Sequence, residues 1–250
     1  MTSWHDLTGH VAVVTGGNAG IGLGFARGLA RDGATVVVWG TNAERNASAA
    51  AELGVSAMTV DVSDADQVRA AMDQVVDQHG RLDSCFANAG VGAVPYAVDE
   101  LPEDEWRRVL DVNLDGVLTT LQAAATHLKR QGDGGSLVAT SSVGSIHGMP
   151  RALPYAASKG AVVALVRSLA VELARESVTV NAVLPGWIDT AMTSAMLATE
   201  PARTRILPRI PARRWGTPED FEAVASFLVG PGSRYLTGQV LTIDGGYSVF

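Results

Sequence analysis

Tyr155 and Lys159 stand four residues apart in the stretch PYAASKG, and their side chains suggest chemistry. The chain holds four tyrosines and only two lysines, Lys129 and Lys159, so the pairing is unusual for this composition. On a helix, residues at this spacing lie side by side on one face. Most such pairs are surface neighbours without a chemical role, so the spacing alone leaves both interpretations open.

A phenol beside an ammonium could exchange a proton with a bound alkoxide. The pKa of a free tyrosine is near 10, too high for efficient exchange at neutral pH. Lowering it by about three units requires roughly 4 kcal/mol of preferential phenolate stabilisation. One ammonium about 4–5 Å away supplies approximately that amount at an effective dielectric near 20. The pair therefore predicts an acid/base for hydride transfer between a nicotinamide and a carbonyl.

Short β-rich runs alternating with longer helical stretches must position this pair. Strands are expected at Val11–Thr15, Thr35–Trp39, Ala57–Val60, Leu82–Ala87, Ser136–Thr140, Val178–Leu184 and Gln239–Ile243. Helices are expected near 20–32, 43–53, 64–79, 102–130, 155–176 and 217–229. Runs that are apolar on both faces and alternate with helices indicate a parallel sheet covered on both sides. The sequence predicts an α/β fold: one doubly wound Rossmann-type domain over residues 1–250, with a seven-stranded parallel sheet flanked by helices.

The first expected strand is followed by TGGNAGIG, residues 15–22, and then by an amphipathic helix. Glycines at 16, 20 and 22 allow a tight turn and a close approach of the backbone to a pyrophosphate. The free N–H groups of the helix N-terminus then favour an anion. A glycine-rich turn alone is weak evidence, but this strand–turn–helix position favours dinucleotide binding.

The end of the second expected strand normally selects between NAD and NADP. A carboxylate there holds the ribose 2′-hydroxyl of NAD, whereas a nearby cation accepts the 2′-phosphate of NADP. Here Gly40 takes the acidic position, Thr41 and Asn42 follow, and Arg45 is the nearest basic residue. Since nothing here repels a phosphate, the sequence slightly favours NADP, with NAD as the alternative.

Residues 185–216 form an irregular segment with four prolines and no expected strand. Long segments of this kind often cover a substrate site. Its arginines could instead form a solvated surface. Met192 and Met196, with Trp187 and Tyr96, are possible pocket walls, and core packing is an equal alternative. Such a pocket would suit an uncharged, partly apolar ketone or alcohol, and His147 could border it.

The composition excludes several classes of protein. A net charge of −7 disfavours nucleic acid, and no apolar run is long enough to span a bilayer. Cys85 is the only cysteine, the histidines are scattered, and no metal-ligand motif occurs, so we expect no disulfide and no metal site. The N-terminal residues lack the pattern of a secretion signal, and a cytoplasmic location is expected.

Together these motifs resemble the short-chain dehydrogenase/reductase family along essentially the whole chain. TGGNAGIG is similar to its TGxxxGIG, ANAG at 87–90 to its NNAG, and YAASK to its Tyr-x-x-x-Lys pair. The resemblance implies catalytic roles for Asn113 in LDVNLDG, Ser142 in TSSVGS, Tyr155 and Lys159. From the residue types alone, Ser142 could merely cap a turn, and Asn113 could merely tie down buried backbone.

The resemblance also implies the cofactor contacts and the assembly. The expected contacts are Gly16, Asn18, Gly20, Ile21, Gly22, Thr41, Asn42, Asp61, Val62, Asn88, Gly90, Tyr155, Lys159, Pro185, Gly186, Ile188 and Thr190. A homotetramer is expected, with helices 102–130 and 155–176 pairing between subunits and the tail 235–247 in a second interface.

The function that these features predict is an NAD(P)(H)-dependent oxidoreductase acting on a small carbonyl or alcohol, such as a carbonyl reductase or an alcohol or polyol dehydrogenase. A 3-oxoacyl carrier-protein reductase is an alternative that needs a basic docking surface. Lys129, Arg130 and Arg175 could contribute to one, but Asp133 and Glu176 stand beside them. A catalytically inactive cofactor-sensing protein is the alternative from a different class.

Overall fold

The computed structural model describes residues 6–250, and at its centre lies one seven-stranded sheet. The strand order is β3-β2-β1-β4-β5-β6-β7, and every neighbouring pair is parallel. The strands are β1 (Val11–Thr15), β2 (Thr35–Gly40), β3 (Ser56–Thr59), β4 (Ser84–Ala87), β5 (Gly135–Thr140), β6 (Val178–Pro185) and β7 (Val240–Ile243). The predicted fold is confirmed, with strand ends shifted by at most two residues.

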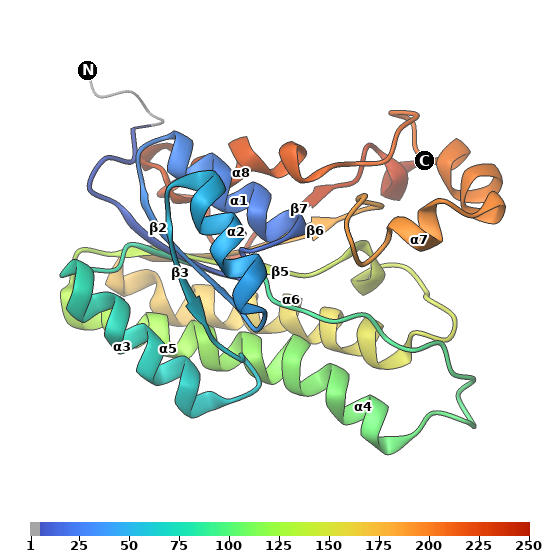
Figure 1. The fold of residues 1–250 in the computed structure, drawn as a ribbon, viewed down its shortest axis with the longest axis horizontal. Helices are drawn as coiled ribbons and strands as arrows, with labels where there is room; N and C mark the ends of the chain where they lie inside the picture. The colour runs from blue at the N-terminus through green and yellow to red at the C-terminus, as the bar shows by residue number, and fades with distance from the viewer. Residues whose placement is uncertain (1–5) are drawn as a thin grey trace.

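Helices cover both faces of this sheet (Figure 1). They are α1 (Gly20–Arg31), α2 (Ala43–Leu53), α3 (Ala65–His79), α4 (Glu103–Leu110), α5 (Gly116–Gln131), α6 (Leu153–Leu173), α7 (Ser194–Leu197) and α8 (Glu222–Val229). Alternate residues of each strand enter opposite cores, since side chains alternate across a sheet. Val13 packs with residues of α3, α5 and α6, whereas Val14 packs with residues of α1 and α8.

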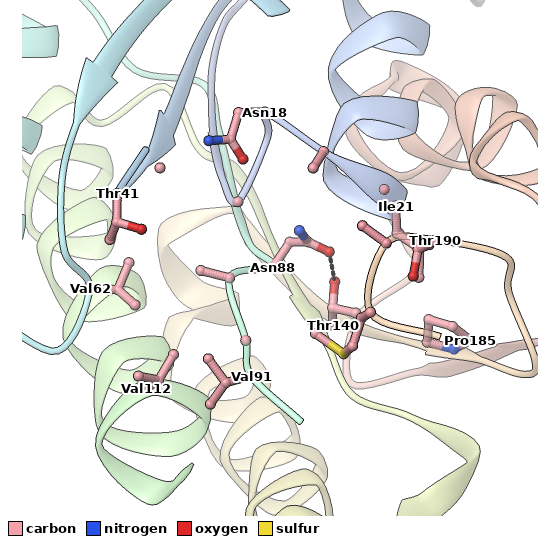
Figure 2. A pocket seen from close by; sticks show the side chains of 18 of the residues that line it. Asn18, Ile21, Thr41, Val62, Asn88, Val91, Val112, Thr140, Pro185 and Thr190 are labelled. Atoms are coloured by element: carbon pink, nitrogen blue, oxygen red, sulfur yellow. Dashed lines mark hydrogen bonds between the residues drawn. The ribbon is translucent and has the colours of Figure 1, made fainter. Parts of the chain in front are cut away.

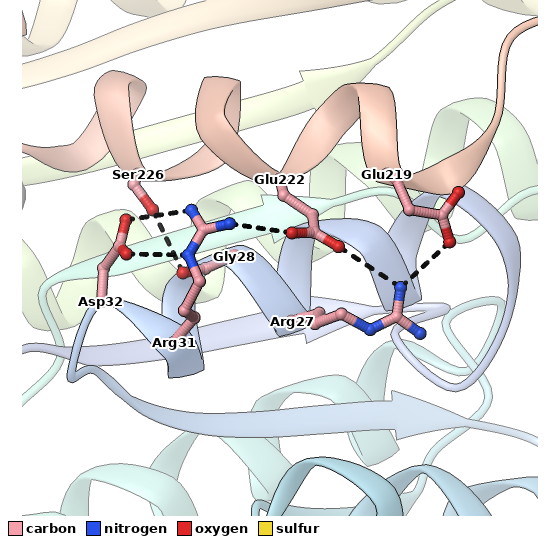
Figure 3. Close-up of polar contacts among 7 residues, drawn as sticks. All are labelled: Arg27, Gly28, Arg31, Asp32, Glu219, Glu222 and Ser226. Carbon is pink, nitrogen blue, oxygen red and sulfur yellow. Dashed lines mark hydrogen bonds and ion pairs between the residues drawn. The ribbon is translucent and has the colours of Figure 1, made fainter.

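Helices α1 and α8 are joined by a charged network on their exposed side (Figure 3). Glu222 of α8 accepts hydrogen bonds from Arg27 at 3.4 Å and from Arg31 at 2.9 Å. Arg27 also bonds to Glu219 and Glu52, so it connects three segments of the chain. This network fixes α1, the helix that begins at the glycine-rich turn.

Two expected helices differ from the observed ones. The helix expected at 102–130 is interrupted between α4 and α5 by a π-helical turn, Asp111–Asp115, which contains Asn113. The helix expected at 217–229 begins with a 3₁₀ turn, Pro218–Phe221, before α8. After Pro185, the last residue of β6, segment 185–216 contains α7, two further short helical turns and a bridge between Ile188 and Gly216.

The topology places a crevice at the carboxyl ends of β1 and β4. Strand β1 lies between β2 and β4, so the direction in which successive strands are added reverses there. Doubly wound sheets bind ligands at this reversal. None of the helices within residues 6–250 has the length and apolar character that crossing a membrane requires.

Candidate active site

A cavity of about 520 Å³ opens at this crevice and joins the glycine-rich turn to the Tyr155 region. Figure 2 shows side chains that line it, among them Asn18, Asn88 and Thr140. Sixteen of the seventeen residues expected to contact a cofactor line it. They come from the ends of β1, β2, β3, β4 and β6, from α6 and from the segment after β6. The structure therefore brings together residues that are spread over most of the chain.

Gly22 is the one expected contact that does not line the cavity. Gly22 lies beneath the turn: a Cβ on it would come 2.2 Å from the Gly16 carbonyl oxygen, which explains why a glycine is needed there. Gly16 itself has a φ of 63°, and α1 begins at Gly20. The turn thus presents backbone and a helix N-terminus to the cavity, the arrangement that suits a pyrophosphate.

At the end of β2, two amide side chains lie where a side chain at position 40 would stand. Asn18 donates a hydrogen bond to Asn46 Oδ1 at 2.7 Å, and the two amides fill the space beside Gly40. A Cβ at position 40 would lie 2.2 Å from Asn18 Nδ2. Thr41, Asn42 and the exposed Arg45 line this end of the cavity. The Asn42 carboxamide oxygen also caps α2 by accepting a hydrogen bond from the Arg45 N–H at 2.8 Å.

Ser142, Tyr155 and Lys159 line the other end of the cavity. Lys159 is buried in α6 and donates a hydrogen bond to the Thr140 carbonyl oxygen at 2.8 Å. Its Nζ lies 5.8 Å from the centroid of the Tyr155 ring. The predicted proximity of phenol and ammonium on one helix is therefore present, at the end of β5 that also carries Ser142.

The electrostatics of this pair differ from the expectation of an acidic phenol. Burial raises the pKa of the Tyr155 phenol, and a hydrogen bond with Ser142 opposes this in part. Burial also lowers the pKa of the Lys159 ammonium from 10.5 to about 8. Desolvation disfavours the charged form of both groups and therefore opposes the expected three-unit lowering of the Tyr155 pKa.

Asn113 lies next to the cavity but does not line it. It is fully buried, and its carboxamide bonds to both backbone polar groups of Val91. A Cβ on Gly90 would lie 3.1 Å from Asn113 Oδ1 and 3.5 Å from Lys159 Nζ, so these two side chains flank Gly90. The observed contacts are those of an amide that ties down backbone beside the lysine.

Segment 185–216 contributes one wall of the cavity through residues 185–193. Thr190 lies over the glycine-rich turn, where a Cβ on Gly20 would come within 3.2 Å of it. Among the possible wall residues only Met192 lines the cavity. The rings of Trp187 and His147 instead pack against Tyr247, at centroid distances of 6.0 Å and 5.7 Å, and neither Tyr96 nor Met196 borders the cavity.

Several residues that line the cavity were not among those predicted from the sequence. Thr140 and Ser141 precede Ser142 at the end of β5, and Thr193 follows Thr190 by three residues. The end of a buried strand was the available signal for the first two, since ligands bind at such ends. The others that line the cavity are Ala19, Trp39, Gly40, Arg45, Val60, Ala89, Val91, Val112 and Ala191.

The family model described as enoyl-(acyl carrier protein) reductase matches residues 16–248. A solved short-chain type dehydrogenase/reductase from Mycobacterium marinum is 35% identical to this chain, with a TM-score of 0.92. The match covers 99% of this chain and 98% of that one. The chain belongs to the short-chain dehydrogenase/reductase family.

The relatives of this chain within the short-chain dehydrogenase/reductase family are named after different substrates. The 3-oxoacyl-[acyl-carrier-protein] reductase FabG of Thermotoga maritima is 38% identical over 96% of this chain and 98% of its own length. The 2-dehydro-3-deoxy-D-gluconate 5-dehydrogenase of Escherichia coli is 36% identical over 97% and 96%. A gluconate 5-dehydrogenase from Burkholderia cenocepacia, solved with NADP and tartrate, is 34% identical over 98% of both chains, with a TM-score of 0.93.

Proposed function

We propose that this chain is an NAD(P)(H)-dependent oxidoreductase that interconverts a ketone or aldehyde and the corresponding alcohol. The observation that carries the proposal is that Ser142, Tyr155 and Lys159 share one cavity with the glycine-rich turn. The cavity has room beside the turn for a dinucleotide, and its backbone suits a pyrophosphate. A nicotinamide bound there supplies or accepts the hydride.

We assign the acid/base role to the Tyr155 hydroxyl. In the reductive direction it gives its proton to the carbonyl oxygen as hydride reaches the carbonyl carbon, and in the oxidative direction it takes that proton back. The Ser142 hydroxyl, which accepts a hydrogen bond from Gly144 N–H at 3.0 Å, orients the substrate oxygen. Lys159 favours the phenolate when it is charged, and Asn113 holds the backbone beside it.

NADP is the proposed cofactor, with NAD as the alternative. The amides of Asn18 and Asn46 occupy the space in which a carboxylate at position 40 would stand. Arg45 lines the same end of the cavity and supplies a cation for a 2′-phosphate. Asp61 and Val62 line the cavity nearby and would contact the adenine.

The proposed substrate is a small carbonyl compound or alcohol, as for a carbonyl reductase or an alcohol or polyol dehydrogenase, and 185–216 is proposed to cover it. Reduction of a 3-oxoacyl group on a carrier protein is the second candidate, favoured by the similarity to FabG. The catalytically inactive sensor is disfavoured because it has no chemical need for three reactive side chains in one cavity.

A cytoplasmic homotetramer is the proposed assembly, with α5 and α6 in one interface and β7 with the C-terminal turn in another. Exposed apolar side chains on these elements support it: Val171 on α6 is 82% exposed and Phe250 is 74% exposed. Light scattering at micromolar concentration tests the assembly, and a mass of 26 kDa, that of one chain, would contradict it.

Oxidation of NADPH and NADH in the presence of a panel of ketones tests the activity. We expect turnover by the wild-type protein and a loss of about 10²–10⁴-fold in kcat for Tyr155→Phe. Undiminished turnover by that variant would remove Tyr155 as the acid/base. Cofactor binding without turnover of any ketone or alcohol would favour the inactive sensor.

A further inference from the structure

The part of segment 185–216 that lies beyond the cavity is strongly basic. Residues 203–214 contain five arginines, and no acidic residue occurs from 201 to 218. We call this set the arginine cluster: Arg203, Arg205, Arg209, Arg213 and Arg214. All five are exposed. This concentration of positive charge contrasts with the net charge of −7 of the whole chain.

Most of this charge is not neutralised within residues 6–250. Arg214 pairs with Asp220 through two contacts of 2.6 Å, and it is the one member of the cluster with a carboxylate partner there. Arg213 donates to the Pro208 carbonyl oxygen at 3.0 Å. The other four guanidinium groups of the cluster therefore have no carboxylate partner within residues 6–250. A guanidinium binds a carboxylate or phosphate through paired hydrogen bonds.

Arg209 links the cluster to the reactive end of the cavity. Its guanidinium carbon lies 4.7 Å from the centroid of the Tyr247 ring, and this stacking restricts its position. Tyr247 in turn contacts the rings of His147 and Trp187. His147 belongs to the loop that follows Ser142, and Trp187 lies between two residues that line the cavity. Figure 1 shows the backbone around α7 beside the C-terminus.

We propose that the arginine cluster selects substrates that carry an anionic group, a carboxylate or a phosphate, away from the reacting carbonyl, and that Arg209 is the principal contact. The inference rests on the proposed function and narrows its substrate class to oxo acids and their phosphate counterparts. It differs from the uncharged ketone expected from the sequence. Of the four residues expected to form apolar walls for that ketone, only Met192 lines the cavity. A small anion is favoured over an acidic carrier because Arg209 is fixed beside loops that border the cavity.

Matched pairs of compounds test the charge preference. The carboxylate probes are levulinate and 4-oxocyclohexanecarboxylate, each compared with its methyl ester, and the phosphate probe is dihydroxyacetone phosphate, compared with dihydroxyacetone. Thermal shifts with saturating NADP⁺ measure binding, and NADPH oxidation measures kcat/KM. For at least one pair, we expect kcat/KM to be about 10-fold higher for the anionic compound than for its neutral partner. This difference should decrease as the salt concentration rises from 50 to 500 mM.

Arg209→Gln should remove this advantage while leaving the ester and the KM for NADPH unchanged. Arg69→Gln is the matched control, because Arg69 is an exposed arginine on α3 that pairs with Asp66. The proposal would be overturned if acid and ester bound equally, or if Arg209→Gln affected both equally. It would also be overturned if only an acyl chain on an acidic carrier were turned over faster. Failure of the proposed function is distinct: no member of any pair is then turned over, whereas the thermal shifts still report charge-selective binding or its absence.

Discussion

Asn113 holds Val91 through both polar atoms of its carboxamide. Its Oδ1 accepts the Val91 N–H at 2.8 Å, and its Nδ2 donates to the Val91 carbonyl oxygen at 2.9 Å. Val91 lines the cavity, and Asn113 and Lys159 flank Gly90. The amide therefore fixes the loop after β4 against the turn that separates α4 from α5.

Asn113→Leu should impair both stability and catalysis. It leaves two partly buried backbone groups of Val91 without partners, which costs roughly 2–6 kcal/mol of unfolding free energy at about 1–3 kcal/mol for each group. We expect kcat to fall about 10-fold or more in the protein that remains folded, because the backbone beside Lys159 is displaced. Chemical denaturation and steady-state kinetics measure the two effects.

Asn181→Leu is the matched control for this substitution. Asn181 is also buried, donates to the Leu236 carbonyl oxygen at 2.7 Å and accepts the Gln239 N–H at 3.0 Å, but it does not line the cavity. It should lose similar stability and keep its kcat. Equal losses of kcat in the two variants would show that Asn113 acts only through stability.

Lys159→Met should change the pH dependence of stability. Burial lowers the pKa of Lys159 from 10.5 to about 8, so between these pH values the unfolded chain binds more protons at this group than the folded chain. The unfolding free energy contributed by Lys159 therefore rises with pH, by roughly 3 kcal/mol across the window. Chemical denaturation of both proteins from pH 7 to 10.5 should show the unfolding free energy of wild type increasing relative to that of the variant. Parallel pH dependences would contradict the lowered pKa of Lys159.

Local patterns were sufficient to predict most of the fold and of the candidate site. Buried strands such as β1 and β2 contain continuous apolar runs, and Tyr155 and Lys159 are four residues apart on one helix. Both features depend on residues close together in the sequence. For the same reason the glycine-rich turn could be placed before α1 from its spacing and position.

Features that depend on distant contacts could not be predicted in this way. The π-helical turn at Asp111–Asp115 contains Asn113, whose partner Val91 is 22 residues away. The exclusion of a side chain at Gly40 arises from Asn18 and Asn46, which are 28 residues apart. The raised pKa of Tyr155 results from burial by several elements, which spacing on α6 does not reveal.

Arg45→Gln should weaken the preference for NADP. Arg45 lines the cavity at the end of β2, where Gly40 provides no carboxylate. Loss of a charged hydrogen bond to the 2′-phosphate should raise the KM for NADPH about 10-fold and leave the KM for NADH unchanged. Steady-state kinetics with both cofactors measure this, and a parallel change in the two KM values would indicate that Arg45 does not meet the phosphate.

Thr193→Val should loosen the wall of the cavity that carries Thr190. The Thr193 hydroxyl accepts the Thr190 N–H at 3.1 Å and donates to the Ile188 carbonyl oxygen, so one side chain ties together two lining residues. Valine keeps the shape and removes these bonds, each worth about 1 kcal/mol. We expect the KM for the cofactor to rise about 5- to 10-fold, with kcat within twofold of wild type, because the reacting groups are untouched. Thr204→Val is the control, since its hydroxyl donates to the Glu200 carbonyl oxygen at 2.8 Å within the same segment but outside the cavity. A similar rise in KM in that control would show that general loosening of the segment, and not the contact with Thr190, governs cofactor binding.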